Sequence, residues 1–247
     1  MSFKRWFRAG MCTLCALVFV LNSRGAQHAS AEGSPSDEAA EAACASSVSA
    51  AYLRLFEAKP EVDIGGWQYT LYTRGCPVTQ EPPQTVRVGG VPVDARIAED
   101  LQRMISDARA QGLGVYLSCG YTDAAAQEHI YQRAVEKYGA FHVQSIVGRP
   151  EENEHRSGLA VDITDRYYEE KTAALENTEL FAWLRMHSSE YGFILRYPKD
   201  RKAITGFIFE PWHFRYVGEE AAAFIAENDL TLEEFRDLYR FADWEKP

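Results

Sequence analysis

The chain has few basic residues relative to acidic ones. It contains 26 lysines and arginines against 36 aspartates and glutamates, and its net charge at pH 7 is −10 with histidine neutral. A nucleic-acid-binding protein needs a basic surface to neutralise phosphates. The excess of acidic residues therefore argues against a nucleic-acid partner, and it argues equally against binding to anionic lipid.

Long hydrophobic runs are also missing, apart from one near the start of the chain. Three basic residues precede an uncharged run at 9–21, and residues 29–31 read Ala-Ser-Ala. This order is typical of a secretory signal peptide, and the run is short for a membrane span, which needs about 20 residues. We predict that residues 1–31 are a signal peptide, with an uncleaved N-terminal membrane anchor as the alternative. The segment holds four basic residues and no acidic ones, so its removal would change the net charge from −10 to −14.

Cysteine is scarce. Beyond the predicted signal peptide only Cys44, Cys76 and Cys119 remain. In an exported protein one pair can oxidise and leave one free thiol, and the sequence does not choose the pair. The three spacings match no zinc-binding pattern. Cysteine is therefore not the expected source of metal ligands.

Internal repeats are absent, and the sequence divides by composition. Residues 32–60 are rich in Ala, Ser and Glu and form either a linker or a helical segment, whereas residues 61–247 have the composition of one globular domain. Within that domain, helical periodicity or capping signals appear at 101–112, 123–139, 180–192 and 219–240, and strand patterns appear at 65–77, 113–121, 158–164, 193–198, 204–210 and 213–218. Helices and strands do not alternate regularly. We predict an α+β fold in which helices pack against an antiparallel sheet.

Two polar clusters interrupt these apolar strands. The first, ENEHRSGLAVDIT at 152–164, places His155 seven positions before Asp162. The second, FEPWHFRYV at 209–217, contains Glu210 and His213. Proline cannot donate to a strand ladder, so a bend at Pro211 can bring Glu210 and His213 to one face.

Together the clusters supply the ligands of a catalytic zinc ion. Such a site uses three N or O ligands and leaves one position open for water, and His155, Asp162 and His213 provide that set. The metal lowers the pKa of water, and Glu210 is placed to take the proton as general base. Each cluster also has a structural interpretation: a hydrogen-bonded histidine at a strand start, an aspartate at a strand edge, or an aromatic anchor beside a solvated acid. The structural interpretations are less convincing when they are taken together, because they require two unrelated polar insertions in the apolar strands.

The two motifs resemble those of the VanY type of D-alanyl-D-alanine carboxypeptidases. These zinc peptidases share their fold with the hedgehog signalling domain, and their pattern is S-E-H-x-x-G-x-A-x-D followed by E-P-W-H. The resemblance covers about residues 67–218 and implies a hedgehog-like fold, zinc bound by His155, Asp162 and His213, and Glu210 as general base. It implies a peptidoglycan stem peptide ending in D-Ala-D-Ala as substrate, and hence a location outside the cytoplasm, secreted or anchored facing the cell wall. The matching residues are Glu154, His155, Gly158, Ala160, Asp162, Glu210, Pro211, Trp212 and His213.

Departures from the family pattern fall on substrate recognition. The family's Ser-Gly-Tyr-Arg-Ser…Gln frame fits at Gly120, Tyr121 and Gln127, but it puts Cys119 at the serine and Thr122 at the arginine expected to bind a substrate carboxylate. The serine two positions before the first histidine is Asn153.

The predicted substrate-binding residues are Gln127, Thr122, Asn153 and Trp212, although Trp212 is also a candidate core residue. Arg156, Arg196 and Arg215 are candidates for the missing charge, with ordinary surface arginines as the alternative. Two further functions stay open: a cell-wall peptide-binding module with little turnover, and a peptidase that cuts another stem or cross-link bond.

Overall fold

The structure is a computed structural model that describes residues 50–73, 75, 76 and 82–240. The chain forms two compact units, Met1–Lys59 and Pro60–Pro247. In the first unit, residues 50–58 are helical. The predicted signal peptide lies outside the described residues.

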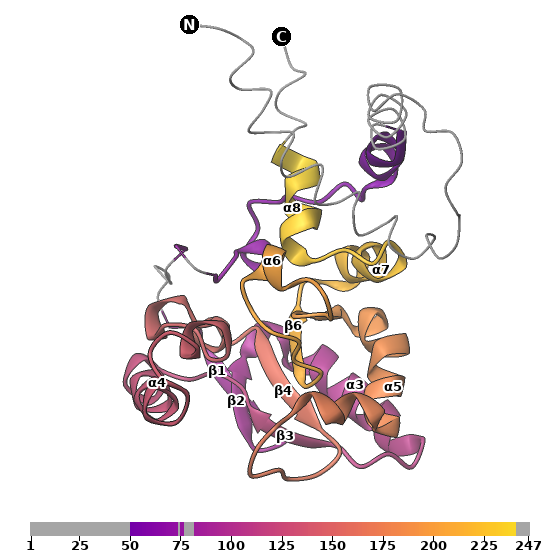
Figure 1. Ribbon diagram of the computed structural model, residues 1–247. Helices are drawn as coiled ribbons and strands as arrows, with labels where there is room; N and C mark the ends of the chain where they lie inside the picture. Colours follow the sequence, from indigo (N-terminus) through magenta and orange to yellow (C-terminus); the bar gives the residue numbers. More distant parts are fainter. Residues whose placement is uncertain (1–49, 74, 77–81, 241–247) are drawn as a thin grey trace, which may run out of the picture. The chain divides into compact units, whose positions relative to one another are not determined.

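The second unit combines short strands with helices of up to four turns (Figure 1). Its strands are β1 (Thr85–Val88), β2 (Val91–Asp94), β3 (Tyr116–Cys119), β4 (Ala160–Thr164), β5 (Phe193–Leu195) and β6 (His213–Tyr216). Its α-helices are α3 (Ala98–Ala110), α4 (Ala124–Tyr138), α5 (Glu179–His187), α6 (Lys202–Thr205), α7 (Glu219–Glu227) and α8 (Leu232–Arg240). Single 3-10 turns are η1 (Trp67–Tyr69), η2 (Ala95–Ile97), η3 (Val143–Ser145), η4 (Pro150–Glu152), η5 (Glu154–Ser157), η6 (Ala173–Asn177) and η7 (Ser188–Tyr191).

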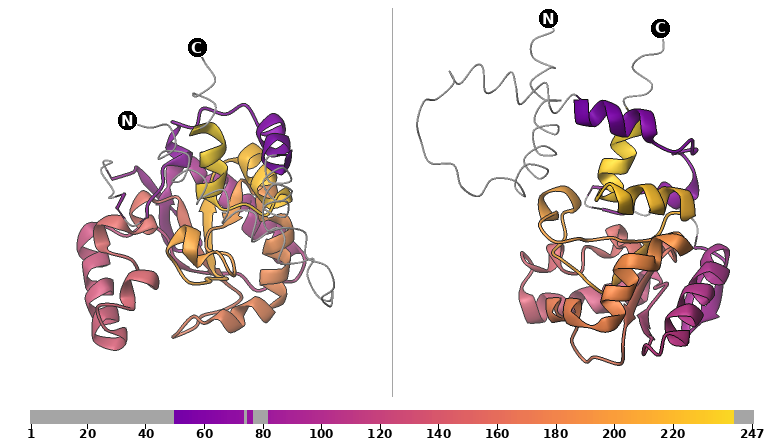
Figure 2. Two further views of the ribbon diagram at one scale, coloured as in Figure 1. Left: turned by 45° about the horizontal axis from the view of Figure 1, so that its top comes forward. Right: turned by 90° about the vertical axis from the view of Figure 1, so that its right-hand side faces the viewer.

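The central sheet has the strand order β3-β4-β6-β5, and every neighbouring pair is antiparallel. β1 and β2 form a separate hairpin that turns at Gly89 and Gly90. Figures 1 and 2 show α4 on the opposite side of the sheet from α3 and α5. The predicted α+β class, with helices flanking an antiparallel sheet, is confirmed.

The two faces of the sheet differ in chemistry because side chains alternate along each strand. Val161 and Phe214 are cross-strand partners on one face and belong to the main hydrophobic core, together with apolar residues of α3 and α5. Asp162 and His213 are the next pair and lie on the other face. All five residues of β4 are buried, so the polar face is covered as well as the apolar one.

Side-chain caps fix several helix ends where the sequence predicts them. The Asp123 carboxylate accepts a hydrogen bond from Ala126 N at 2.8 Å and starts α4. Before α8, the Glu234 carboxylate accepts from Thr231 N at 2.8 Å and the Thr231 hydroxyl accepts from Glu234 N at 3.2 Å. This is a capping box, which satisfies two backbone donors at the helix start.

The strand predicted at 65–77 is wrong. Its aromatic alternation instead accompanies η1 and an isolated bridge between Thr73 and Cys76. The reason is a buried guanidinium: Arg215 donates to the carbonyl oxygens of Gln68 and Thr70, both at 2.9 Å. Those carbonyls are thereby satisfied by a side chain rather than by a neighbouring strand.

The strand predicted at 204–210 is also wrong. Its first residues end α6, and Gly206 follows with φ +82°, a left-handed conformation that ends the helix. Phe207 then stacks on Tyr197, with ring centroids 4.5 Å apart, instead of alternating across a sheet. β5 pairs with β6, and the segment 204–210 takes no part in the sheet.

In the part of the chain that the structure describes, no helix combines the length and the apolar character needed to cross a membrane.

Candidate metal centre and active site

Three polar side chains lie in a row across the central sheet. Asp162 in β4 is paired with His213 in β6 on one side and with Cys119 in β3 on the other. Directly opposed residues of antiparallel strands project from the same face. The sheet therefore presents a carboxylate between an imidazole and a thiol.

His155 reaches this row from the turn that precedes β4. The side-chain amide oxygen of Asn153, Oδ1, accepts from His155 N at 2.9 Å and caps η5, and Gly158 ends the turn with φ +73°. The His155 ring is oriented by Gly120, whose carbonyl oxygen lies 2.9 Å from Nδ1. Because a carbonyl oxygen only accepts, Nδ1 carries the proton and Nε2 keeps its lone pair.

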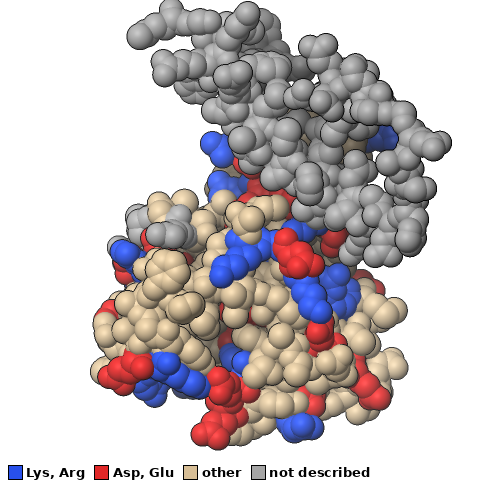
Figure 3. Space-filling model, in the orientation of Figure 1, with Lys and Arg blue, Asp and Glu red and all other residues tan. Residues whose placement is uncertain are grey.

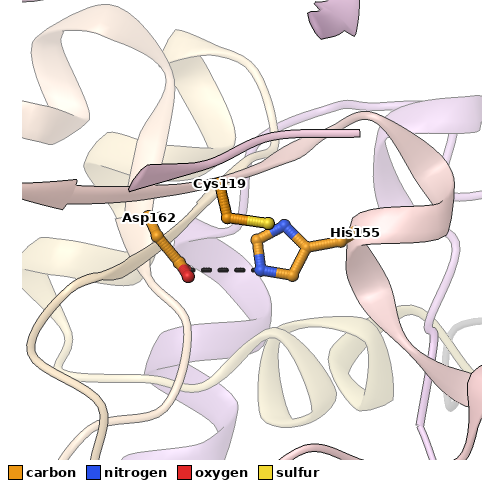
Figure 4. Close-up of side chains that lie close together, drawn as sticks. All are labelled: Cys119, His155 and Asp162. Carbon is orange, nitrogen blue, oxygen red and sulfur yellow. Dashed lines mark ion pairs between the residues drawn. The ribbon is translucent and has the colours of Figure 1, made fainter. Parts of the chain in front are cut away.

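One nitrogen of each imidazole lies against the same carboxylate oxygen of Asp162. Asp162 Oδ1 lies 3.3 Å from His155 Nε2 and 3.3 Å from His213 Nδ1. Figure 4 shows the first of these contacts. All three residues are buried, with 7 %, 4 % and 4 % of His155, Asp162 and His213 exposed.

The hydrogen-bonding partners of the two imidazoles show what this point requires. His213 Nε2 lies 3.1 Å from the Glu154 carboxylate, which only accepts, so His213 Nδ1 keeps its lone pair. Asp162 Oδ1 is buried and has no hydrogen-bond partner among the described residues. Three lone pairs that face one point in a buried site are stabilised by a cation between them. Two imidazoles and one carboxylate are the donor set of a catalytic zinc ion, so the residues fit that group.

Lys171 fixes the second oxygen of Asp162. Its ammonium donates to Asp162 Oδ2 and lies 5.5 Å from the centre of the Trp212 ring. Burial raises the pKa of Asp162, but the charge of Lys171 is the largest opposing effect, and the pKa is held well below its ordinary value. Lys171 thus leaves Oδ1 for the imidazoles. The sequence gives no sign of this residue, because a lysine in the loop after β4 belongs to no motif.

Glu210 lies at the edge of the cluster. The His213 N–H donates to Glu210 O at 3.1 Å, so the bend predicted at Pro211 is present as a turn immediately before β6. Glu210 Oε2 is 3.6 Å from His213 Nδ1. Burial raises the pKa of Glu210 to about 7, with His213 opposing the shift and Asp162 adding to it. A carboxyl group with that pKa can both accept and release a proton near neutral pH.

Glu154 contacts three side chains of the cluster. It accepts from Arg196 Nε at 2.9 Å and from an Arg215 nitrogen at 2.5 Å, in addition to its contact with His213. Burial raises the pKa of Glu154, but Arg196, Arg215 and His213 outweigh burial and lower it. A carboxylate that holds the outer nitrogen of a ligating histidine fixes the tautomer and orientation of the ring. Glu154 was matched to the motif by sequence, but this role was not predicted.

Both interpretations of Arg196 and Arg215 given by the sequence are wrong. The two side chains are fully buried, so they are not surface arginines, and their guanidinium groups bind Glu154, Glu233 and backbone oxygens. Neither is free to bind a substrate carboxylate. Buried guanidinium groups need such partners, because an unpaired buried charge is strongly destabilising.

The four predicted substrate-binding residues surround the cluster, and their contact with substrate stays a prediction. Thr122 N donates to His155 O at 3.2 Å, and the Thr122 hydroxyl donates to Gln127 at 2.9 Å. Asn153 uses its amide oxygen to cap η5 and donates from its amide nitrogen to Val147 O at 2.6 Å. Trp212 is 92 % buried beside Lys171.

Cys76 and Cys119 are both free thiols, so they do not form the disulfide that the sequence left open. Cys44 lies outside the described residues. Cys119 Sγ, one ring nitrogen of His155 and one carboxylate oxygen of Asp162 lie within 4.8 Å of one another (Figure 4). The spacing of the cysteines gave no sign of this proximity, since it arises from pairing between distant strands.

Two known bacterial proteins are similar in sequence to this chain. The protein YodJ of Bacillus subtilis is 39% identical over 139 residues, which are 56% of this chain and 51% of YodJ, so this chain spans about half of that relative's length. The D-alanyl-D-alanine carboxypeptidase of Enterococcus faecalis is 34% identical over 194 residues, which are 73% of this chain and 70% of that enzyme.

Solved structures give the same result at the level of the fold. The vancomycin resistance D,D-pentapeptidase VanY, a mutant in complex with Zn(II), has a TM-score of 0.62 and 34% identity, over 69% of this chain and 99% of that one. VanYB in complex with D-alanine-D-alanine has a TM-score of 0.60 and 32% identity, over 73% and 100%. The LD-carboxypeptidase LdcB has a TM-score of 0.55 and 34% identity, over 64% and 76%.

The family model VanY, described as D-alanyl-D-alanine carboxypeptidase, matches residues 91–219. These residues include Asp162 and His213 in the central sheet, His155 in the turn before β4 and Glu210 in the turn before β6. The chain belongs to the VanY family of D-alanyl-D-alanine carboxypeptidases.

Proposed function

We propose that this protein is an exported zinc-dependent D-alanyl-D-alanine carboxypeptidase that trims peptidoglycan stem peptides. The observation that carries the proposal is the convergence of His155 Nε2, Asp162 Oδ1 and His213 Nδ1, with Glu210 3.6 Å from the last of these. The Zn(II) and D-alanine-D-alanine complexes of similar VanY-type structures support the choice of metal and substrate.

In the proposed mechanism, His155, Asp162 and His213 hold the metal and Glu210 moves the proton. When bound, a zinc ion lowers the pKa of a water molecule and polarises the scissile carbonyl. Glu210 takes a proton from the attacking water and passes it to the leaving amine, so that the amide C–N bond breaks and D-alanine leaves. Glu154 and Gly120 keep the two imidazoles in the required tautomers. Lys171 holds Asp162 with Oδ1 toward the imidazoles.

The experiment is an assay of D-alanine release from a stem pentapeptide. We expect the wild-type protein to release D-alanine, and Glu210→Gln to lose about 10²–10⁴ of the rate, as is typical when a general base is removed. Glu227→Gln, an exposed position at the end of α7, is the matched control and should retain the rate. Chelation should remove activity from the wild type, and added zinc should restore it. Equal rates for Glu210→Gln and the control would reject Glu210 as the base.

A second candidate is an L,D-carboxypeptidase, which cuts one residue earlier in the stem. LdcB and the L,D-carboxypeptidase DacB are similar in structure at 34% and 28% identity. Thr122 stands where the family pattern has an arginine expected to bind the substrate carboxylate, and this difference supports a different substrate. Separate assays with a stem pentapeptide and a stem tetrapeptide decide between the two: D-alanine from the pentapeptide alone supports the D,D activity, and D-alanine from the tetrapeptide supports the L,D activity. Binding of both without release would indicate a peptide-binding module.

Export is part of the proposal because the substrate lies outside the cytoplasm. It is supported by the signal-like sequence of residues 1–31. Determining the N-terminus of the protein recovered from the culture medium and from the membrane fraction tests it. A new N-terminus near residue 32 supports cleavage, an intact N-terminus in the membrane fraction supports an anchor, and an intact N-terminus in the cytoplasm contradicts export.

A further inference from the structure

The position of Cys119 depends on an irregularity in β3. Leu117 is paired with Ile163, and a regular ladder would therefore pair Ser118 with Asp162. The register shifts between Leu117 and Cys119, so that Cys119 becomes the partner of Asp162 instead. Such a bulge re-aims a side chain to the other face of a sheet. Here it turns the thiol toward the face that carries Asp162 and His213.

The thiol then lies beside two of the proposed zinc ligands. Ligand atoms of Cys119, His155 and Asp162 lie within 4.8 Å of one another (Figure 4). Asp162 is 96 % buried, and its Oδ1 has no hydrogen-bond partner in the described chain, an independent sign that this point is built to receive a ligand. Cys119 is half-buried and forms no disulfide, and its thiol donates one long hydrogen bond, to Gly120 O at 3.6 Å.

Cys119 and His213 lie on opposite sides of Asp162. Neighbouring strands are about 4.8 Å apart, so side chains two strands apart start from backbones about 10 Å apart. Two ligand sets therefore overlap: His155 and Asp162 are shared, His213 completes one set and Cys119 completes the other. The first offers nitrogen and oxygen atoms, and the second adds sulfur, which favours soft, thiophilic cations.

We propose that Cys119, His155 and Asp162 form a second metal site that binds thiophilic divalent cations such as Cd²⁺ and competes with the zinc site for its shared ligands. Binding forms a sulfur–metal bond as the thiol releases its proton to solvent and the thiolate donates a lone pair. The inference uses the residues of the proposed function but does not require that the protein hydrolyse a peptide. It gives this chain a sensitivity to soft metals that serine at position 119 would not confer.

The test is a titration of the metal-free full-length protein with Cd²⁺, followed by the ultraviolet absorbance of the cadmium–thiolate bond. We expect the absorbance to saturate at one equivalent in the wild type and in Cys76→Ser, whose thiol is exposed and outside the cluster. We expect Cys119→Ser to lose this absorbance. Loss of a residue that only hydrogen-bonds to a metal ligand weakens metal affinity about 10–100-fold. Loss of a ligand, as in Cys119→Ser, should therefore weaken Cd²⁺ binding by about tenfold or more. Zinc affinity should change little, because His155, Asp162 and His213 remain.

Two results would overturn the proposal. One is the same cadmium–thiolate absorbance in Cys119→Ser as in the wild type, and the other is stoichiometric Cd²⁺ binding by the wild type without that absorbance. A thermal unfolding curve for each variant shows whether it is folded.

A second experiment, alkylation of the wild-type protein by iodoacetamide, needs no substitution. Cd²⁺ should protect Cys119 from iodoacetamide in peptide mass spectra, and alkylation at an unchanged rate would contradict the site. Failure of D-alanine release with normal thiolate absorbance would refute the enzyme but not this site.

Discussion

Among single residues, Glu154 connects two buried arginines to one histidine of the buried cluster. It meets Arg196, Arg215 and His213 at once, and its side chain has no exposed surface. Removing one member of a buried ionic group leaves the others uncompensated in a medium of low dielectric constant. Glu154 therefore links the stability of the fold to the orientation of a proposed metal ligand.

We expect Glu154→Gln to lower the free energy of unfolding by about 3–5 kcal/mol, because buried Arg215 loses its carboxylate partner and buried Arg196 keeps only Glu233. Chemical denaturation at pH 7 measures this change, and Glu227→Gln is the control for an exposed glutamate. The pKa of Glu154 is lowered in the folded chain, so its contribution is present at neutral pH and lost as pH falls below the ordinary carboxyl range. The difference between wild type and variant should thus shrink in acid. A constant difference would show that packing rather than charge is responsible.

The protonation of Glu210 predicts the pH dependence of the reaction. A general base acts only when deprotonated, and burial raises the pKa of this carboxyl to about 7. We expect kcat/KM to rise with pH as Glu210 loses its proton, with a midpoint at or below about 7 because a bound divalent cation favours the carboxylate. A pH profile of D-alanine release measures this limb. A rate that falls with pH across that range would contradict the assignment.

At the scale of elements, the two motifs gave the residues of the site but not the contacts between them. The sequence predicted β4, β6 and α4 because alternation, a capping aspartate and a terminal glycine are local signals. It could not predict that Asp162 pairs with both His213 and Cys119, since strand order and the bulge in β3 are set by packing between distant segments. The predictions of strands at 65–77 and 204–210 are wrong for the same kind of reason. A buried arginine in the first segment, and an aromatic stack in the second, make contacts that a neighbouring strand would otherwise have made.

The approach of β2 to the residue after β3 gives a prediction about Gly120. A Cβ at this position would lie 2.2 Å from Pro92 O, so the backbone would have to move, and the carbonyl that orients His155 would move with it. We expect Gly120→Ala to lower stability by about 1–3 kcal/mol, as other overpacked sites do. It should also weaken zinc binding.

Denaturation and zinc titration measure the two effects of Gly120→Ala. Gly65→Ala is the control, because that residue is exposed and its added Cβ would meet only the carboxylate of Asp63, 3.2 Å away. Wild-type zinc affinity in Gly120→Ala would show that the His155 ring does not depend on this carbonyl.

At the scale of the whole molecule, charges of both signs are interspersed. Figure 3 shows acidic and basic side chains mixed over one face, with a recess near its middle. The net charge of −10 therefore does not appear on this face as one continuous acidic field.

The division into two units predicts that the second folds by itself. The main hydrophobic core draws on residues between Trp67 and Tyr216, and the proposed metal ligands and base lie between His155 and His213. Because a domain with its own core folds independently, a variant lacking residues 1–59 should unfold in one cooperative thermal transition. Its kcat/KM for the pentapeptide should match that of the full chain within about threefold, since no proposed ligand or base is removed. A variant that folds cooperatively but loses activity would show that the first unit takes part in substrate binding, and one that fails to fold would show that the core needs residues before Pro60.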